Sequence, residues 1–164
     1  MPSKAKQAPV VVLDVANIGS AKNLFKIFPT FYKHLLKGRV RIVSGGRVFS
    51  KELRSARSLL PLFVELSKLN LILKLDEEEV NNEQSNFEQL IIAEFGHSVN
   101  DCDDPHLFAL LQLAGAKSVI SGDKRIGACR KCLRESGIQN SKFANAILIS
   151  SNQQYVARFN RKRL

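Results

Sequence analysis

The chain has 164 residues, of which 45% are hydrophobic and 24% are charged, and its formal net charge is +10. This length suits a single globular domain, and this composition excludes an intrinsically disordered chain. The basic net charge excludes an acidic chaperone, and the apolar runs fall short of the roughly 20 residues that a membrane-spanning helix needs.

The first part of the chain predicts a basic tail, a strand and a helix. Residues 1–8 form a basic N-terminal tail without the apolar stretch of a secretory leader, which predicts a cytoplasmic protein. Residues 9–13 are a β-branched apolar run, which is typical of a buried parallel strand. The helix that follows is expected to begin at Ser20 or Asn23 and to be broken or bent near Pro29.

The middle of the chain predicts two strands, at residues 40–43 and 71–75. After a glycine turn, Ser50 is the expected N-cap of a helix, and Pro61 is expected to open the next one. The polar residues 76–84 predict a loop.

Two helix starts follow this loop. Ser85 with Glu88 three residues later matches a capping box, which predicts a helix over residues 86–99. Asp104 followed by Pro105 predicts an N-cap with proline at the first helical position.

The last part of the chain predicts strands at residues 119–121 and 146–149, with a helix at 124–136 between them. We therefore expect one domain over residues 9–155, followed by a basic tail over residues 156–164. Alternating strands and helices predict a three-layer α/β/α fold with a mostly parallel sheet. Because the C-terminal ends of parallel strands share one edge, we expect the functional site there.

Charge is strongly segmented along the chain. Residues 1–75 carry 14 Lys and Arg against three acids, residues 76–108 carry ten acids and no Lys or Arg, and residues 109–164 carry 11 against two. A basic protein with an acidic segment suits an enzyme that holds a divalent metal and attracts nucleic acid. The alternative explanation is that the acidic runs are solvated loop residues and that the basic net charge only keeps the protein soluble.

Acids lie just after the predicted strands or at the predicted helix starts, namely Asp14, Glu52, Asp104 and Asp123. Several carboxylates at one edge repel each other unless a divalent cation binds between them. Oxygen ligands without a convergent histidine pair favour Mg²⁺ or Mn²⁺ over zinc. We expect these acids to be both the metal ligands and the catalytic residues. Acids that merely favour a helix N-terminus are the simpler alternative for Glu52 and Asp104.

The acid-bearing segments resemble the PIN-domain nucleases, a family that includes the toxins of many toxin–antitoxin pairs. Residues 10–14, 101–114 and 119–123 are similar to the family's opening strand and to its third and fourth acids, and Glu52 lies in a region like that of its second acid. Members of the family usually have a small polar residue two positions after the first acid. Here that position is Ala16, and the polar residue is Asn17, one position later. This spacing is closer to the NYN branch of PIN-like nucleases. The resemblance implies a metal-dependent ribonuclease, with Asn17 supporting the metal ligands.

Two further acids are weaker candidates. Asp101 is a possible additional metal ligand or a solvated loop residue. Glu88 is an alternative to Glu52 as the second acid, although its capping-box role explains it fully.

Basic residues beyond the predicted strand ends are expected to bind the phosphates of a nucleic acid. They are Lys22, Lys51, Arg54, Lys124 and Arg125. Such contacts give affinity without sequence specificity.

The three cysteines do not make an even disulfide framework, and we expect them to be reduced thiols. Cys102, His106, Cys129 and Cys132 have the ligand types of a zinc site, but the last two cysteines fall inside a predicted helix, which argues against one. We expect His106 to pack or be exposed in the first turn of its helix, with orientation near the site or phosphate contact as alternatives. His34 is expected on a helix surface.

These observations together predict a Mg²⁺- or Mn²⁺-dependent endoribonuclease. RNA is the expected partner, and the resemblance implies an antitoxin protein as a possible second partner. A homodimer is a further possibility, and we expect no association with a membrane. A catalytically silent PIN-like module that binds nucleic acid is the main alternative. A metal-dependent phosphatase acting on small molecules is a third hypothesis, for which the basic surface would be superfluous.

Overall fold

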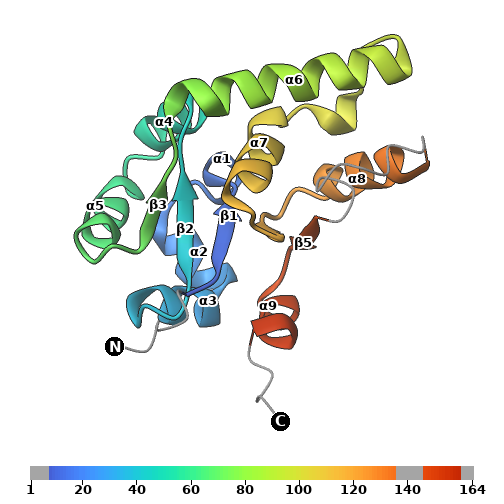
Figure 1. The fold of residues 1–164 in the computed structure, drawn as a ribbon. Coiled ribbons are helices and arrows are strands. Elements are labelled where there is room, and N and C mark those ends of the chain that lie inside the picture. Colours follow the sequence, from blue (N-terminus) through green and yellow to red (C-terminus); the bar gives the residue numbers. More distant parts are fainter. Residues whose placement is uncertain (1–7, 136–145, 160–164) are drawn as a thin grey trace, which may run out of the picture.

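A computed structural model describes residues 8–135 and 146–159. Its centre is a five-stranded sheet in the order β3-β2-β1-β4-β5 (Figure 1). The strands are β1 Val10–Leu13, β2 Arg41–Ser44, β3 Ile72–Lys74, β4 Ser118–Ile120 and β5 Ile147–Ile149. All neighbouring pairs are parallel, which confirms the predicted α/β class.

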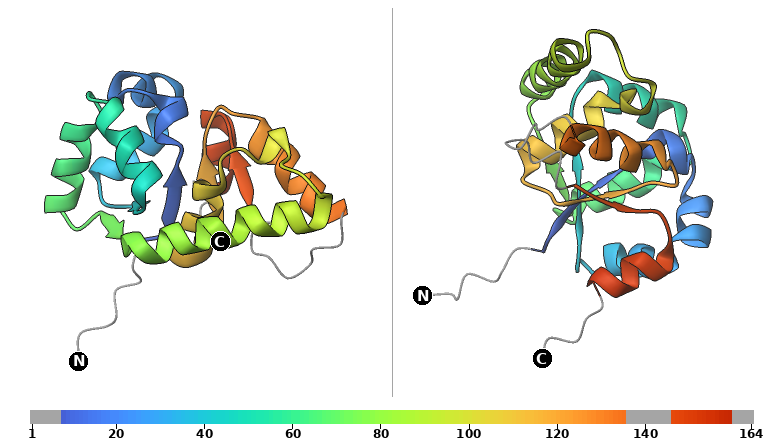
Figure 2. Two further views of the ribbon diagram at one scale, coloured as in Figure 1. Left: turned by 90° about the horizontal axis from the view of Figure 1, so that it is seen from above. Right: turned by 90° about the vertical axis from the view of Figure 1, so that its right-hand side faces the viewer.

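Helices connect the strands and cover both faces of the sheet. They are α1 Val15–Ile18, α2 Ala21–Ile27, α3 Pro29–Leu36, α4 Arg47–Ser55, α5 Leu60–Lys68, α6 Glu77–Phe95, the 3₁₀ turn η1 Asn100–Cys102, α7 Pro105–Ala114, α8 Arg125–Glu135 and α9 Asn152–Phe159. The chain crosses the sheet in one direction from β1 to β3 and in the other from β3 to β5. Right-handed crossovers then place α1–α5 on one face and α6–α8 on the other, as Figure 2 shows for the long rod of α6.

The core lies on both faces of the central strands, and helix α7 covers them on one face. Val11, Val12 and Leu13 of β1 are fully buried. Helix α7 packs on β1, β2 and β4 as well as on α6, and six consecutive residues from His106 to Leu111 are buried. Phe108 of α7 stacks on Phe87 of α6 with ring centroids 4.7 Å apart. Burial on several sides explains why α7 is apolar apart from His106 and Gln112, without the one-sided pattern of a surface helix.

The helix after β2 begins earlier than the sequence predicts. It starts at Arg47, and Ser50 lies inside it, so the predicted N-cap at Ser50 is wrong. Gly46 is the N-cap, with φ at +86°, and a Cβ there would collide with Val80 of α6. Because only glycine adopts this conformation easily, the chain turns directly from β2 into the helix. Glu52 consequently lies in the second turn of α4.

The predicted loop over residues 76–84 is also wrong, because α6 begins at Glu77. Asp76 is its N-cap, and its carboxylate accepts a hydrogen bond from the Glu79 N–H at 3.0 Å. Acidic residues in the first turn favour the positive end of the helix dipole. Ser85 is therefore inside a helix and forms no capping box.

Helix α9 packs on α3 and was not predicted from the sequence. Its Tyr155 is buried and its hydroxyl lies 2.8 Å from Nδ1 of His34. The expectation that His34 lies on a helix surface is therefore wrong. The predicted tail over residues 156–164 begins inside α9, while residues 1–7, 136–145 and 160–164, which include the predicted helix end, lie outside the described residues.

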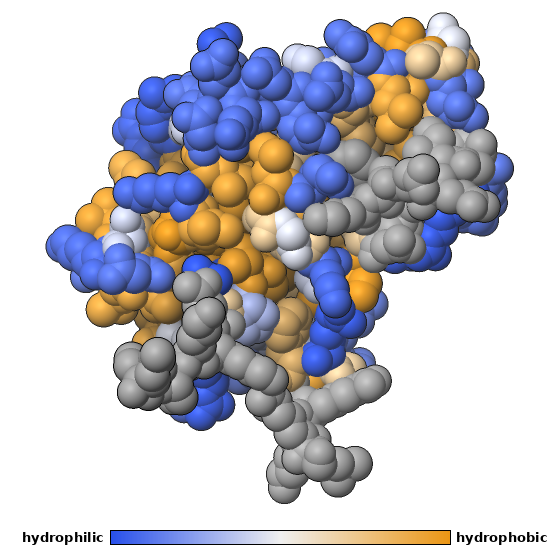
Figure 3. Space-filling model, in the orientation of Figure 1, coloured by the Kyte–Doolittle hydropathy of each residue, from blue (hydrophilic) through white to orange (hydrophobic). Residues whose placement is uncertain are grey.

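The face of the molecule in Figure 3 carries hydrophilic and hydrophobic areas. Most of α6 is hydrophilic there, and hydrophobic atoms gather below it, on the side where β2, β3 and α5 lie. Leu60, Val64 and Leu69, on and just beyond α5, are among the exposed apolar residues. In the part of the chain that the structure describes, no helix has the length and apolar character required to cross a membrane.

Candidate functional site

The candidate site lies at the C-terminal ends of β1 and β4, where the strand order reverses. Asp14 directly follows β1, and Ser121 directly follows β4. The Ser121 hydroxyl donates a hydrogen bond of 2.6 Å to Oδ2 of Asp14, and the Asn17 N–H donates one of 3.3 Å to Oδ1. In open parallel sheets this crevice is the usual place for a binding site.

Asp14 is an unusual carboxyl group because it is only 3% exposed. Burial raises its pKa, and the negative charge of Glu52 raises it further. The hydrogen bonds from Ser121 and Asn17 act in the opposite direction, because they stabilise the carboxylate. Asp14 is therefore fixed in position while its negative charge is poorly solvated, as is common for a ligand of a cation.

Asn17 joins the two strand ends. Its side-chain Oδ1 accepts a hydrogen bond of 2.7 Å from the Gly122 N–H, across the gap between α1 and the segment after β4. A Cβ at Gly122 would lie 3.0 Å from this oxygen, so glycine permits the close approach. The contact gives Asn17 the means to support the segment that carries Asp123.

Glu52, Asp104 and His106 form a second part of the site, which we call the inner group. They come from α4, from the N-cap of α7 and from its first turn, and each has a metal-ligating atom within 4.8 Å of the others. His106 Nε2 lies 3.1 Å from Glu52 Oε2, and the side chains are 4% and 20% exposed, respectively. These residues could hold a metal ion.

Asp104 is the most strongly perturbed acid of the inner group. Its side chain makes no capping hydrogen bond to α7, so the carboxylate is not committed to the helix. Burial, followed by the negative charges of Asp14 and Asp103, raises its pKa to about 6. A bound divalent cation would favour the carboxylate form, because it offsets the repulsion from the neighbouring acids.

Asp104 also belongs to an outer group, together with Asp103 and Asp123, whose oxygens again lie within 4.8 Å of one another. Arg125 pairs with two of its three carboxylates, donating hydrogen bonds of 2.6 Å to Asp103 and 2.9 Å to Asp123. The guanidinium lowers the pKa of Asp123, and the two carboxylates raise the pKa of Arg125.

The structure thus brings together Asp14, Glu52, Asp104 and Asp123, which the sequence singled out. Asp101 lies in η1 and joins neither group within the described residues. Glu88 is exposed on α6, where its carboxylate accepts a hydrogen bond of 3.1 Å from Gln84, and it too lies outside both groups.

Of the predicted phosphate-binding residues, Lys22, Lys51, Arg54 and Lys124 are exposed. Arg125 is exposed too, but it is engaged by the outer group. Lys51 and Glu52 both line a hollow of about 470 Å³ between α1 and α4, together with Ala16 and Ser55. Glu52 therefore connects the inner group to a solvent-accessible space with a lysine on its wall.

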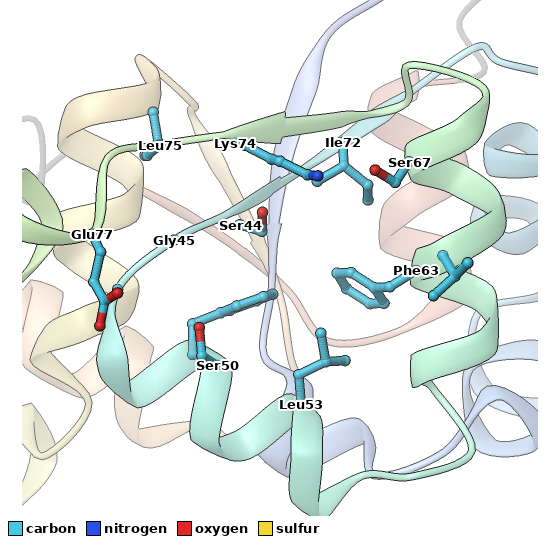
Figure 4. A pocket seen from close by; sticks show the side chains of 13 residues that line it. Ser44, Gly45, Ser50, Leu53, Phe63, Ser67, Ile72, Lys74, Leu75 and Glu77 are labelled. Atoms are coloured by element: carbon cyan, nitrogen blue, oxygen red, sulfur yellow. The ribbon is translucent and has the colours of Figure 1, made fainter.

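A second groove lies on the opposite face of α4 (Figure 4). Leu53 from α4 and Phe63 from α5 point into it, and Ile72 and Lys74 of β3 border it. It is lined by none of the residues of the inner or outer group, so it is separate from the candidate site.

The expectation that all the cysteines are reduced thiols is wrong for two of them. Cys102 of η1 forms a disulfide with Cys129 of α8, although they are 27 positions apart in the sequence, while Cys132 is free. The fold packs η1 against α8, a contact that sequence spacing does not reveal. The disulfide links the segment before Asp104 to the helix after Asp123, and it removes two of the four possible zinc ligands, Cys102 and Cys129.

Sequence reasoning named a position near the site only as an alternative for His106, and it missed the role of Ser121. A signal for His106 was present, because it lies two positions after Asp104 in the same helix start. Its partner Glu52 is 54 positions away, however, and only the packing of α4 near α7 brings them together.

The chain matches no protein-family model, no curated protein and no solved structure.

Proposed function

We propose that this chain is a metal-dependent endoribonuclease that uses Mg²⁺ or Mn²⁺ and resembles the PIN-like nucleases. The observation that carries the proposal is the convergence of Asp14, Glu52 and Asp104, from three separate elements, at the strand edge where β1 meets β4. The donor set of carboxylates and one imidazole fits a divalent cation, because their mutual repulsion is otherwise unbalanced.

A metal bound here would activate water for attack on a phosphodiester and stabilise the leaving oxygen. The protein's own contribution is to hold the acids in place. Ser121 and Asn17 fix Asp14, His106 contacts Glu52, and the start of α7 places the backbone of Asp104 beside them.

RNA is the proposed substrate because the chain is strongly basic outside the acidic segment. Lys51 lines the hollow beside Glu52, and Lys124 directly follows Asp123. These exposed cations are suited to holding phosphates on either side of the reacting one. The toxin role, an antitoxin partner, a homodimer and work in the cytoplasm belong to the same proposal.

The test is cleavage of a mixed, end-labelled RNA by purified protein with Mg²⁺, Mn²⁺ or EDTA. We expect cleavage with either metal, none with EDTA, and a rate at least roughly tenfold lower for Glu52→Gln. Glu88→Gln is the matched control, because it makes the same change on the exposed face of α6. Equal effects of the two substitutions would contradict the assignment of Glu52.

The second candidate function is a catalytically silent module that binds nucleic acid. The observation that favours it is Arg125, which engages Asp103 and Asp123 of the outer group and so occupies carboxylates that a cation would need. RNA binding without cleavage in every metal would establish this alternative. Cleavage would exclude it.

A further inference from the structure

The inner group contains a nitrogen donor in a place where the sequence predicted only oxygen. His106 is at the second position of α7, and its side chain is almost completely buried next to Glu52 and Asp104. The described part of the chain has one other buried histidine, His34, whose ring contacts the Tyr155 hydroxyl, remote in the fold from both acid groups.

The spacing within the inner group suits ligands of a single ion. Ligands bound about 2.1 Å from one ion at adjacent positions lie about 3 Å apart. His106 Nε2 and Glu52 Oε2 are separated by 3.1 Å, and an oxygen of Asp104 lies within 4.8 Å of both. The pair therefore has the separation of neighbouring ligands before any side chain moves.

We propose that His106 Nε2 is itself a metal ligand, and that this nitrogen makes the inner group select Mn²⁺ over Mg²⁺. The proposal deepens the proposed function, because it concerns the metal of the same site. Imidazole is a good ligand for transition metals, whereas Mg²⁺ takes oxygen ligands and keeps several of its waters.

Orientation of Glu52 is the competing role for His106. A histidine that only donated a hydrogen bond to Glu52 would help Mg²⁺ and Mn²⁺ equally, since both would use the same carboxylate. A glutamine could replace it in that role, because its amide N–H₂ also donates. A ligating nitrogen has a different consequence, since its loss lowers the affinity for Mn²⁺ more than that for Mg²⁺.

The first measurement is calorimetric titration of the metal-free full-length protein with Mn²⁺ and with Mg²⁺. For wild type we expect tighter binding of Mn²⁺. For His106→Gln we expect Mn²⁺ affinity to fall by at least about tenfold with little change for Mg²⁺. His34→Gln is the matched control, because it alters a buried histidine outside the inner group, and both affinities should stay at the wild-type level.

The second measurement detects the nitrogen directly. Pulsed electron paramagnetic resonance of Mn²⁺ bound to the wild-type protein should show coupling to a histidine nitrogen. The coupling should change when the histidines are labelled with ¹⁵N, and it should be absent in His106→Gln. The variant assigns the coupling to His106, and absence of coupling in the wild-type spectrum overturns the proposal even if the variant does not fold.

Absence of histidine coupling in wild type overturns the proposal. So does an equal loss of both metals in His106→Leu with full recovery in His106→Gln, which would make His106 an orienting residue. Neither measurement contains RNA, so a failure of the nuclease proposal is seen separately, as a lack of cleavage by protein that binds Mn²⁺ through His106.

Discussion

The inner and outer groups share Asp104 but balance its charge in different ways. In the inner group, Asp104 lies beside Glu52 and the buried imidazole of His106. In the outer group, it lies beside two further acids, which the half-exposed guanidinium of Arg125 contacts. Arg125 stays charged at ordinary pH and pairs with two of the outer group's three carboxylates, whereas the partner of Glu52 in the inner group is the imidazole of His106. The difference supports the inner group as the cation site of the proposed function, and in the same proposal the outer group would have to release Arg125 before binding a cation.

The largest expected effect separates two neighbouring acids. Asp104→Asn should lower RNA cleavage by more than roughly 100-fold, because it removes a ligand common to both groups. Asp103→Asn makes the same change one residue earlier, in the outer group alone, and should leave most activity. Cleavage rates under saturating Mn²⁺ test the pair, with circular dichroism to establish folding. Equal losses would show that the two groups act as one.

The disulfide provides the next test, because it holds the outer group's two segments together. Replacement of Cys129 by alanine should lower the free energy of unfolding by about 3.5 kcal/mol in the chain-entropy model, for a loop closed over 27 positions. Cys132→Ala is the control, since this thiol is free. Denaturant unfolding measures both. If reduction with a dithiol weakens RNA cleavage as well as stability, the geometry of the outer group matters for activity.

A smaller effect concerns the dependence of stability on pH. The folded-state pKa of Asp104 is about 6, above its ordinary value of 3.8, so the folded protein favours the protonated carboxyl. The resulting stabilisation is fully present below about pH 4 and is lost as the pH rises through about 6. Asp14, whose pKa is also raised, adds an effect of the same sign.

The measurement is the thermal midpoint of metal-free wild type and Asp104→Asn between pH 4 and pH 7. The variant should gain stability relative to wild type up to about pH 6 and then keep a constant advantage. Mn²⁺ should reverse the difference, because it binds the carboxylate form. A constant difference across this range would mean that Asp104 is well solvated.

Much of the site could be predicted because parallel strands bring distant residues to one edge. The apolar run before Asp14 and the Ser-Gly-Asp sequence ending at Asp123 each mark the end of a strand. Because β1 and β4 are parallel neighbours, the two acids lie at the same edge of the sheet. The contact between His106 and Glu52 depends on the packing of α4 near α7, which no local pattern encodes. The start of α4 was likewise hidden, because a left-handed Gly46 replaces the usual side-chain cap.

The smallest effect distinguishes cations that can bind phosphate from one that is already engaged. RNA affinity of the metal-free protein should fall with the logarithm of salt concentration, and each phosphate contact contributes a slope of about −0.7. Lys51→Gln and Lys124→Gln should each make the slope shallower by about that amount. Arg125→Gln makes a matched change in charge, but its guanidinium already donates to Asp103 and Asp123, so the slope should stay the same. A shallower slope for Arg125→Gln would show that RNA displaces the two carboxylates, which would free the outer group to bind a cation when substrate arrives.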